Sequence, residues 1–450
     1  MARLVTSRQR IQHLLRRAAF GYQASELEEY ALLGFEGAVE RLLNPEKVND
    51  SATDAVLASI LEPMAGNPDD RDVDRVQREA LYRAWYVRIS ISKRPLLERM
   101  TYFWHDHFAT SQAKVQKATY MQQQNETLRR HALGSFRELL LAMAQDPAML
   151  MYLDNRLNVR GKPNENYARE LMELHTLGVG TGYKETDIKE AARALTGWRI
   201  ENHKAVFKTS MFDSGEKTIL GSKDNFNHEK LVDLLAGDRR TAAHLADKLV
   251  RYFVRPDGEA ALTRRATDEY MKTGGSMRDV MRTILLSEAM YSDGAYRAII
   301  KSPTELVCGT QRALEIATDG RAEKNFASPM GQVLYEPPNP AGWSGDGDWV
   351  NATTVLARSN YAQQTTVRNS KSAADVAVLL RRYGATTSAA AVVDFTLDLL
   401  VGGDTDATTR TVLIEHIGGA NHFNFEQAAR DGSLQGMMYL ALSMPLYQVA

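Results

Sequence analysis

The sequence predicts a mainly α protein, a large multi-helical domain with a small β-hairpin insertion around residues 199–222. Apolar residues recur at three- and four-residue steps over most of the 450 residues, which is the period of an amphipathic helix. β-branched residues alternate with polar residues near 199–222, between turn signals at Asn202-His203 and Asp213-Ser214-Gly215. The composition, with 44% hydrophobic and 25% charged residues, is typical of a globular chain.

The first 20 residues are expected to form an amphipathic helix with several arginines and no acid. Ile11, Leu14, Leu15 and Ala18 share one face, so we expect them to pack inward and the arginines to point outward. The alternative is that the basic face touches a membrane surface or nucleic acid. The formal net charge of −1 gives no global attraction to nucleic acid, so no nucleic-acid partner is expected.

The helical pattern continues in separate segments. Residues 25–45 are expected to form two helices, separated at Gly34, of which the second ends at Pro45. Residues 133–155 are expected to form two helices separated near Asp146-Pro147. The helical segments are 25–45, 72–92, 94–110, 133–155, 164–178, 184–198, 228–237, 241–254 and 351–364.

Residues 325–349 are expected to form a long irregular loop, because Pro and Gly are frequent there. The sequence predicts a core domain over 1–370 that contains this loop and the hairpin insertion. It also predicts a helical C-terminal subdomain over 371–450 that packs on the core.

The single cysteine, Cys308, excludes an internal disulfide and lies in an apolar helical setting, where a small buried residue is expected. No stretch reaches about 18 consecutive apolar residues, the length that a transmembrane helix needs. No apolar run of signal-peptide type follows the N-terminal arginines. The chain as given is therefore expected to be cytoplasmic.

The stretch "FWHDHF", residues 103–108, places two histidines around Asp106. On a helix His107 shares a face with the apolar residues of 96–108, whereas His105 points about 200° away. The two imidazoles would therefore chelate one ion only if the helix ended near Trp104 and the chain became extended.

The stretch "NENYARELMELHTLG", residues 164–178, brings carboxylates to a second helix. Glu170 lies between apolar positions and is expected to be largely buried, with Glu173 on the same side. Arg169 is four residues from both Glu165 and Glu173, the spacing of helical ion pairs.

A buried carboxylate must be protonated, paired or bound to metal. One interpretation is a site for a transition metal, iron, manganese or zinc, held by His105, His107, Glu170 and Glu173. His105, His107 and Glu170 would be the catalytic groups, while Asp106, Arg169 and Glu165 would orient the ligands. The other interpretation is a buried polar network without catalysis. Trp343 and Trp349, in the loop 325–349, are expected to cover the site or contact its ligand.

Several motifs resemble those of the bacterial family catalogued as domain of unknown function 1800. They are "LLRRAAFG", "WHDHF", "NENYARELMELHTLGVG", "IKSPTELV" and "PPNPAGWSGDGDWVNATTVLAR", and the likeness runs from about residue 10 to 448. The resemblance implies a helical architecture and a possible partner, a sulfatase-like protein encoded nearby; many members are exported. Asp106 replaces the family's Asn, His175 stands where many members have Phe, and Phe212 replaces a histidine before Asp213.

Two functions follow from these observations. The first is a metal-dependent enzyme, an oxidoreductase or a hydrolase, with its His/Glu site between packed helices. The second is a non-catalytic helical scaffold or protein-interaction module, in which the same residues form a buried polar network that connects the helices.

Overall fold

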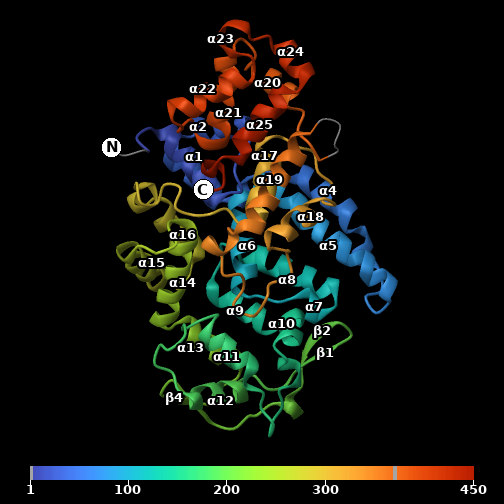
Figure 1. The fold of residues 1–450 in the computed structure, drawn as a ribbon. Helices are drawn as coiled ribbons and strands as arrows, with labels where there is room; N and C mark the ends of the chain where they lie inside the picture. The colour runs from blue at the N-terminus through green and yellow to red at the C-terminus, as the bar shows by residue number, and fades with distance from the viewer. Residues whose placement is uncertain (1–3, 368–371) are drawn as a thin grey trace.

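A computed structural model describes residues 4–367 and 372–450, and it is mainly α, as the sequence predicts (Figure 1). The hairpin insertion is confirmed and consists of two antiparallel pairs. Asn202 and His203 both have positive φ, 47° and 63°, as a tight two-residue turn requires. The paired strands are β1 (Trp198–Glu201) with β2 (Lys204–Phe207), and β3 (Lys217–Ile219) with β4 (Ser222–Asp224).

The N-terminal third is a series of helices in which the predicted break at Gly34 separates two of them. Gly34 has φ +69°, a conformation that favours glycine. These helices are α1 (Ser7–Ala18), α2 (Ala24–Leu32), α3 (Gly34–Leu43), α4 (Ser51–Leu61), α5 (Arg71–Ile91), α6 (Pro95–His107), α7 (Gln112–Val115) and α8 (Ala118–His131).

Helix α1 buries the predicted apolar face, including Ile11 and Leu14, but one of its arginines is not on the surface. Arg17 is only 1% exposed, so the prediction that all the arginines point outward is wrong for this residue. Its position explains the error, since Arg17 lies three residues after Leu14, on the same face of the helix, and is carried inward with the apolar stripe. Its guanidinium donates to the carbonyl of Ala295.

Helix α6 lies at the centre of the molecule and packs against α5 and α8 (Figure 1). Pro95 occupies its first turn, where the missing N–H costs nothing. Trp104 is fully buried, and its indole N–H donates to the carbonyl of Ala132 at 3.0 Å. Burial of one large apolar side chain contributes about 2–3 kcal/mol, so this face fixes the orientation of α6.

Two adjacent residues of α6 form buried ion pairs with different helices. The carboxylate of Glu98 accepts two hydrogen bonds from the guanidinium of Arg129 on α8, one from Nε at 2.7 Å and one from Nη2 at 2.9 Å. Arg99 pairs with Glu305 on α17 (Pro303–Ala313). These pairs fix the rotation of α6, because each links it to a different neighbour.

The middle of the chain carries the two hairpins and five helices at one end of the molecule (Figure 1). The predicted division at Asp146-Pro147 is confirmed, and Asp146 caps the second helix by accepting from the Met149 N–H at 2.9 Å. The helices are α9 (Phe136–Ala144), α10 (Pro147–Tyr152), α11 (Glu165–Glu173), α12 (Glu185–Ala194) and α13 (His228–Ala236).

Helix α11 ends earlier than the periodicity predicts. The N–H of His175 bonds to the carbonyl of Glu170 and that of Leu177 to Met172, five residues back in each case. Gly178 then adopts φ +89°. This wider hydrogen-bonding pattern closes the helix, so His175 lies beyond it and turns into the interior, where it is fully buried.

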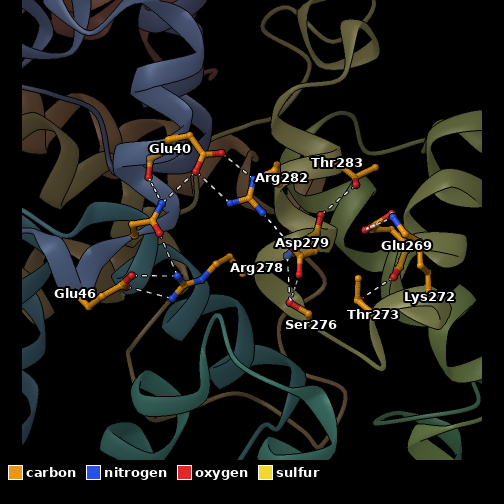
Figure 2. A network of polar contacts seen from close by, with 11 residues as sticks. Glu40, Glu46, Glu269, Lys272, Thr273, Ser276, Arg278, Asp279, Arg282 and Thr283 are labelled. Carbon is orange, nitrogen blue, oxygen red and sulfur yellow. Dashed lines mark hydrogen bonds and ion pairs between the residues drawn. The ribbon is translucent and has the colours of Figure 1, made fainter.

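Three helices, α14 (Arg239–Phe253), α15 (Ala260–Thr273) and α16 (Met277–Leu285), pack on one side of the core. Surface ion pairs link α16 to the N-terminal region, as Figure 2 shows. Arg282 bonds to Glu40 on α3 at 2.7 Å, and Arg278 bonds to Glu46 at 3.0 Å. Exposed pairs of this kind add little stability individually, so the attachment depends mainly on apolar packing.

The C-terminal helices lie at the end of the molecule opposite the hairpins (Figure 1). One hydrophobic cluster extends from α1 through α6 and α17 to these helices. The domain boundary predicted at 370/371 lies outside the described residues, and the division into two units stays a prediction. The remaining helices are α18 (Glu323–Ala327), α19 (Ala352–Thr366), α20 (Val376–Arg382), α21 (Ala389–Val401), α22 (Ala407–His416), α23 (Gly419–His422), α24 (Phe425–Asp431) and α25 (Ser433–Ser443).

The predicted loop 325–349 is irregular in most of its length, but the prediction is wrong for residues 325–327, which belong to α18. Residues 328–351 form a largely irregular segment between α18 and α19, with one-turn helices at 328–330 and 346–349. Cys308 is buried, as predicted, and burial raises the pKa of its thiol. Within 4–367 and 372–450, no helix combines the length and the hydrophobicity needed to cross a bilayer.

Candidate functional site

The last turn of α6 directs three consecutive side chains to three different neighbours. Successive residues on a helix are rotated by about 100°, so His105 and His107 point about 200° apart and do not meet at one ion. The helix continues through His107, and the extended alternative that would have joined the two imidazoles does not occur.

His105 holds the irregular segment against the core. Its Nε2 accepts the backbone N–H of Tyr335 at 3.1 Å, and its ring packs edge-on to Trp85, with ring centroids 4.9 Å apart. Burial lowers the pKa of His105 to about 3, so the ring is neutral at pH 7. His105 therefore has a structural role, in which its neutral ring accepts a backbone hydrogen bond from the irregular segment.

Asp106 holds the same segment at a second point. Its Oδ1 accepts the backbone N–H of Trp343 at 2.8 Å. Gly342 approaches so closely that a Cβ there would lie 2.7 Å from the Asp106 carbonyl oxygen. Burial raises the pKa of Asp106 to about 6, and the Trp343 N–H and Lys248 limit the rise because both favour the charged carboxylate.

His107 links α6 to α14 and to the end of α11. Its Nε2 lies 3.1 Å from the carbonyl oxygen of His175, and its Nδ1 lies 3.1 Å from Lys248 Nζ. A carbonyl oxygen can only accept, so Nε2 donates and Nδ1 accepts from the lysine. Burial and the neighbouring Lys248 hold the pKa of His107 well below its usual value, which keeps the imidazole neutral.

Lys248 is a functional candidate that the sequence analysis missed. It lies on α14 among apolar residues, and His244 precedes it by four residues on the same helix. Burial lowers the Lys248 pKa, while Asp106 opposes that change. The signal in the sequence was a lysine on the apolar side of "TAAHLADKLVRYFV", which indicates a paired or reactive amine.

Asp106 and Lys248 line one cavity of about 330 Å³. Four residues of α6 form a wall of this cavity, because they recur at three- and four-residue steps. Trp343 and Trp349, the predicted ligand contacts, line the same cavity from the irregular segment. The α6 wall consists of Arg99, Tyr102, Phe103 and Asp106.

The predicted metal ligands are not brought together. His105 contacts Tyr335 and His107 contacts Lys248 and His175, whereas Glu170 and Glu173 lie half-buried on α11 with Arg169. In the described part of the chain, no three or more His, Cys, Asp or Glu residues are placed to hold a metal ion. The physical reason is the helical rotation between residues 105 and 107, together with the position of Glu170 away from the core face of α11.

Glu170 also differs from the expectation that it would be largely buried. Partial burial and the neighbouring Glu173 raise its pKa, and Arg169 opposes the rise. Arg169 bonds chiefly to Glu185 on α12, and more weakly to Glu165 at 3.5 Å. These residues therefore form a surface network between α11 and α12.

Phe212, where the family resemblance implies a histidine, lies beside Phe207 of the first hairpin, with ring centroids 5.4 Å apart. Asp213 pairs with Arg193 on α12 at 2.8 Å. Neither residue lines the Asp106 cavity.

A larger hollow of about 1070 Å³ lies beside α5 and α7. It is lined by charged residues such as Arg71, Arg75 and Lys117. We favour the smaller cavity as the candidate site, because half-buried titratable groups and aromatic side chains line it together.

A family model described as "Protein of unknown function (DUF1800)" matches residues 13–449. No curated protein and no solved structure matches the chain.

Proposed function

The chain belongs to the DUF1800 family, whose function is unknown, and from this premise we propose that it is a hydrolase that cleaves small-molecule esters. One observation carries the proposal: an aspartate, a lysine and two tryptophans line the same small cavity. Such a cavity has the size and the mixed apolar and polar lining of a small-molecule site.

Asp106 would act as the general base. Its carboxylate takes a proton from water as the water oxygen attacks the ester carbonyl carbon. The Lys248 ammonium donates a hydrogen bond to the carbonyl oxygen, where negative charge develops. When the C–O bond breaks, the proton held by Asp106 passes to the departing alkoxide, which leaves as an alcohol.

The flanking histidines would position these two groups. His107 accepts from Lys248 and would so fix the position of the ammonium. His105 and the Trp343 N–H attach the irregular segment to α6, which keeps bulk water from the carboxylate. No step is assigned to a metal, because the predicted ligands do not converge.

The test compares wild type with Asp106→Asn and Lys248→Met on a panel of p-nitrophenyl carboxylate esters. We expect wild type to release p-nitrophenol above the buffer rate, and Asp106→Asn to lose about 100-fold or more of kcat. Circular dichroism must show that both variants fold. Absence of turnover by wild type on the whole panel, or full activity of Asp106→Asn, would refute the proposal.

A second candidate function is a non-catalytic scaffold that binds a partner, such as the sulfatase-like protein that the family resemblance implies. The roles of His105 and His107 as acceptors and donors for backbone groups favour this alternative. It predicts that variants at Asp106, His105 and His107 change stability alone.

A further inference from the structure

Two hollows adjoin on the side of the molecule that carries α5, α7, α10 and the first hairpin (Figure 1). The first, beside α5 and α7, has a volume of about 1070 Å³, and the second, which reaches β1, has a volume of about 1050 Å³. Lys117 and Met151 line both hollows, so we treat their lining as one surface and call it the basic surface. No described residue lines both this surface and the Asp106 cavity.

Positive charge is in excess on the basic surface. Among the described residues, seven cations and four carboxylates line the first hollow. Four cations, of which Lys117 is shared, and one carboxylate line the second. The whole chain has a formal net charge of −1, so the excess is local. A surface region of one sign attracts ligands of the opposite sign.

The carboxylates of the first hollow do not neutralise this excess, because each has a cationic partner of its own. Asp69 pairs with Lys117 at 2.6 Å and Asp74 with Arg78 at 3.2 Å, while Glu336 and Glu79 pair with two further lysine and arginine side chains. Six cations of the surface have no carboxylate within ion-pairing distance in the described part of the chain. They are Arg71, Arg75, Arg83, Arg156, Lys162 and Arg199.

The arginines of α5 are spaced for an extended chain. Arg71, Arg75 and Arg78 recur at four- and three-residue steps, so they share one face of the helix. The rise of 1.5 Å per residue places Arg75 about 6 Å along the helix from Arg71. Alternate side chains of an extended peptide point the same way and are about 6–7 Å apart. Acidic side chains at alternate positions of a peptide therefore match successive arginines of α5.

The second hollow combines cations with apolar side chains. Arg199 on β1 donates to the backbone carbonyl of Arg156, which brings the hairpin beside the turn 155–157. Leu157 in this turn is 54% exposed, so a ligand can bury it. Val159 and Ile200 line the same hollow and are half-buried. This end of the surface suits a ligand with apolar groups beside its acidic ones.

The basic surface lacks the exposed rings that a nucleic-acid site uses. Its described aromatic residues, Tyr82 and Tyr120, are only 7% and 5% exposed. Lys324 Nζ lies 3.9 Å from the centroid of the Tyr82 ring and covers a face of it. Single-stranded nucleic acid is held largely by bases that stack on exposed rings, so the surface fits a polypeptide better.

We propose that the basic surface binds an extended segment of a partner protein, acidic along α5 and apolar beside Leu157. Glutamate or aspartate side chains pair with the arginines of α5, and the apolar side chains bury Leu157. The proposal is independent of the proposed hydrolase, because the two sites share no described lining residue. Either can fail without the other.

The test is fluorescence anisotropy of the full chain with a labelled peptide of about 12 residues, about 40 Å when extended. Glutamate occupies alternate positions in one half and leucine in the other half, with serine elsewhere. The reversed sequence is also used, and binding by either peptide supports the proposal. We expect saturable binding that weakens as the salt concentration rises. The absence of saturable binding by both peptides would overturn the proposal. Tighter binding of a single-stranded oligothymidylate of equal charge would overturn it too, in favour of a nucleic-acid site.

Charge variants locate the acidic half. Arg71→Gln combined with Arg75→Gln should weaken peptide binding about tenfold, the loss expected for two exposed ionic contacts. The matched control is Arg264→Gln combined with Arg265→Gln, which removes the same charge from exposed positions of α15 that line neither hollow. The control should bind as wild type does. All four positions are exposed, so both variants should fold, which circular dichroism checks. Equal affinity of wild type and the α5 variant would refute the site.

A leucine variant locates the apolar half. Leu157→Ser should weaken binding of the leucine-containing peptide about fivefold, through the lost apolar contact. It should leave unchanged the binding of a peptide in which serine replaces every leucine. Leu32→Ser, at an 89% exposed position of α2, is the matched control and should alter neither affinity. Equal affinity of wild type and Leu157→Ser for the leucine-containing peptide would refute the apolar end of the proposal.

Discussion

Gly342 lies directly against Asp106, although 236 positions separate them in the sequence. A Cβ at Gly342 would lie 2.7 Å from the Asp106 carbonyl oxygen, which belongs to the rigid helix α6. The φ of Gly342, +86°, is also unfavourable for other residues. Two constraints therefore act at one position, where the segment that covers the cavity meets the helix that carries the candidate base.

Gly342→Ala should lower the free energy of unfolding and release the segment 331–345. Its matched control is Gly345→Ala, where φ is +76° but the nearest atom is Trp349 Nε1 at 3.9 Å. Both variants incur the conformational cost of about 1–3 kcal/mol, and only Gly342→Ala adds a clash with the backbone. Urea denaturation and limited proteolysis measure the difference; equal losses in the two variants would show that the close contact is unimportant.

His107→Ala should destabilise the protein by about 2–4 kcal/mol, because it leaves a cavity and an unpaired carbonyl at His175. His131→Ala, at a half-buried position, should have a smaller effect. Urea denaturation checks stability, and elemental mass spectrometry checks metal content. About one equivalent of iron, manganese or zinc in wild type that His107→Ala loses would contradict the network described above and restore the predicted metal site.

Arg129→Met should cost about 3–5 kcal/mol, because it leaves the buried carboxylate of Glu98 without its partner. The double variant Glu98→Leu with Arg129→Met should recover part of this loss, since no buried charge then remains unpaired. Arg130→Met, on the exposed side of α8, should change stability by less than about 0.5 kcal/mol. Chemical denaturation of the four proteins tests the pair; a double variant less stable than Arg129→Met would contradict it.

Asp146 should make stability depend on pH. Burial raises the pKa of this carboxyl from 3.8 to about 7, so the folded protein binds the proton more tightly than the unfolded chain does. Its contribution to the free energy of unfolding is complete below pH 3.8 and is lost as the pH rises through about 7. Between these two pKa values, each pH unit lowers the free energy of unfolding by about 1.4 kcal/mol.

Asp146→Asn should flatten this pH dependence while its side-chain oxygen still caps α10 by accepting from the Met149 N–H. Urea denaturation at pH 4.5, 6 and 8 compares the variant with wild type. The same decline in both proteins between pH 4.5 and 8 would assign the effect to other groups.

The sequence by itself determined the local structure. Its apolar period identified the helices, Gly34 and Pro147 marked their boundaries, and the turn at Asn202-His203 marked a hairpin, because each of these signals acts within a few residues. The rotation between His105 and His107 was also available from helix geometry alone.

Only the tertiary structure decided what the polar side chains contact. Lys248 reaches His107, Trp343 reaches Asp106, and Arg17 enters the core beside Arg99, all across long stretches of sequence. Glu170 and His107, which the sequence analysis placed at one site, have different partners for the same reason. Helical periodicity fixes the face on which a residue lies, whereas its partner depends on how distant helices pack, and no local pattern in the sequence encodes that packing.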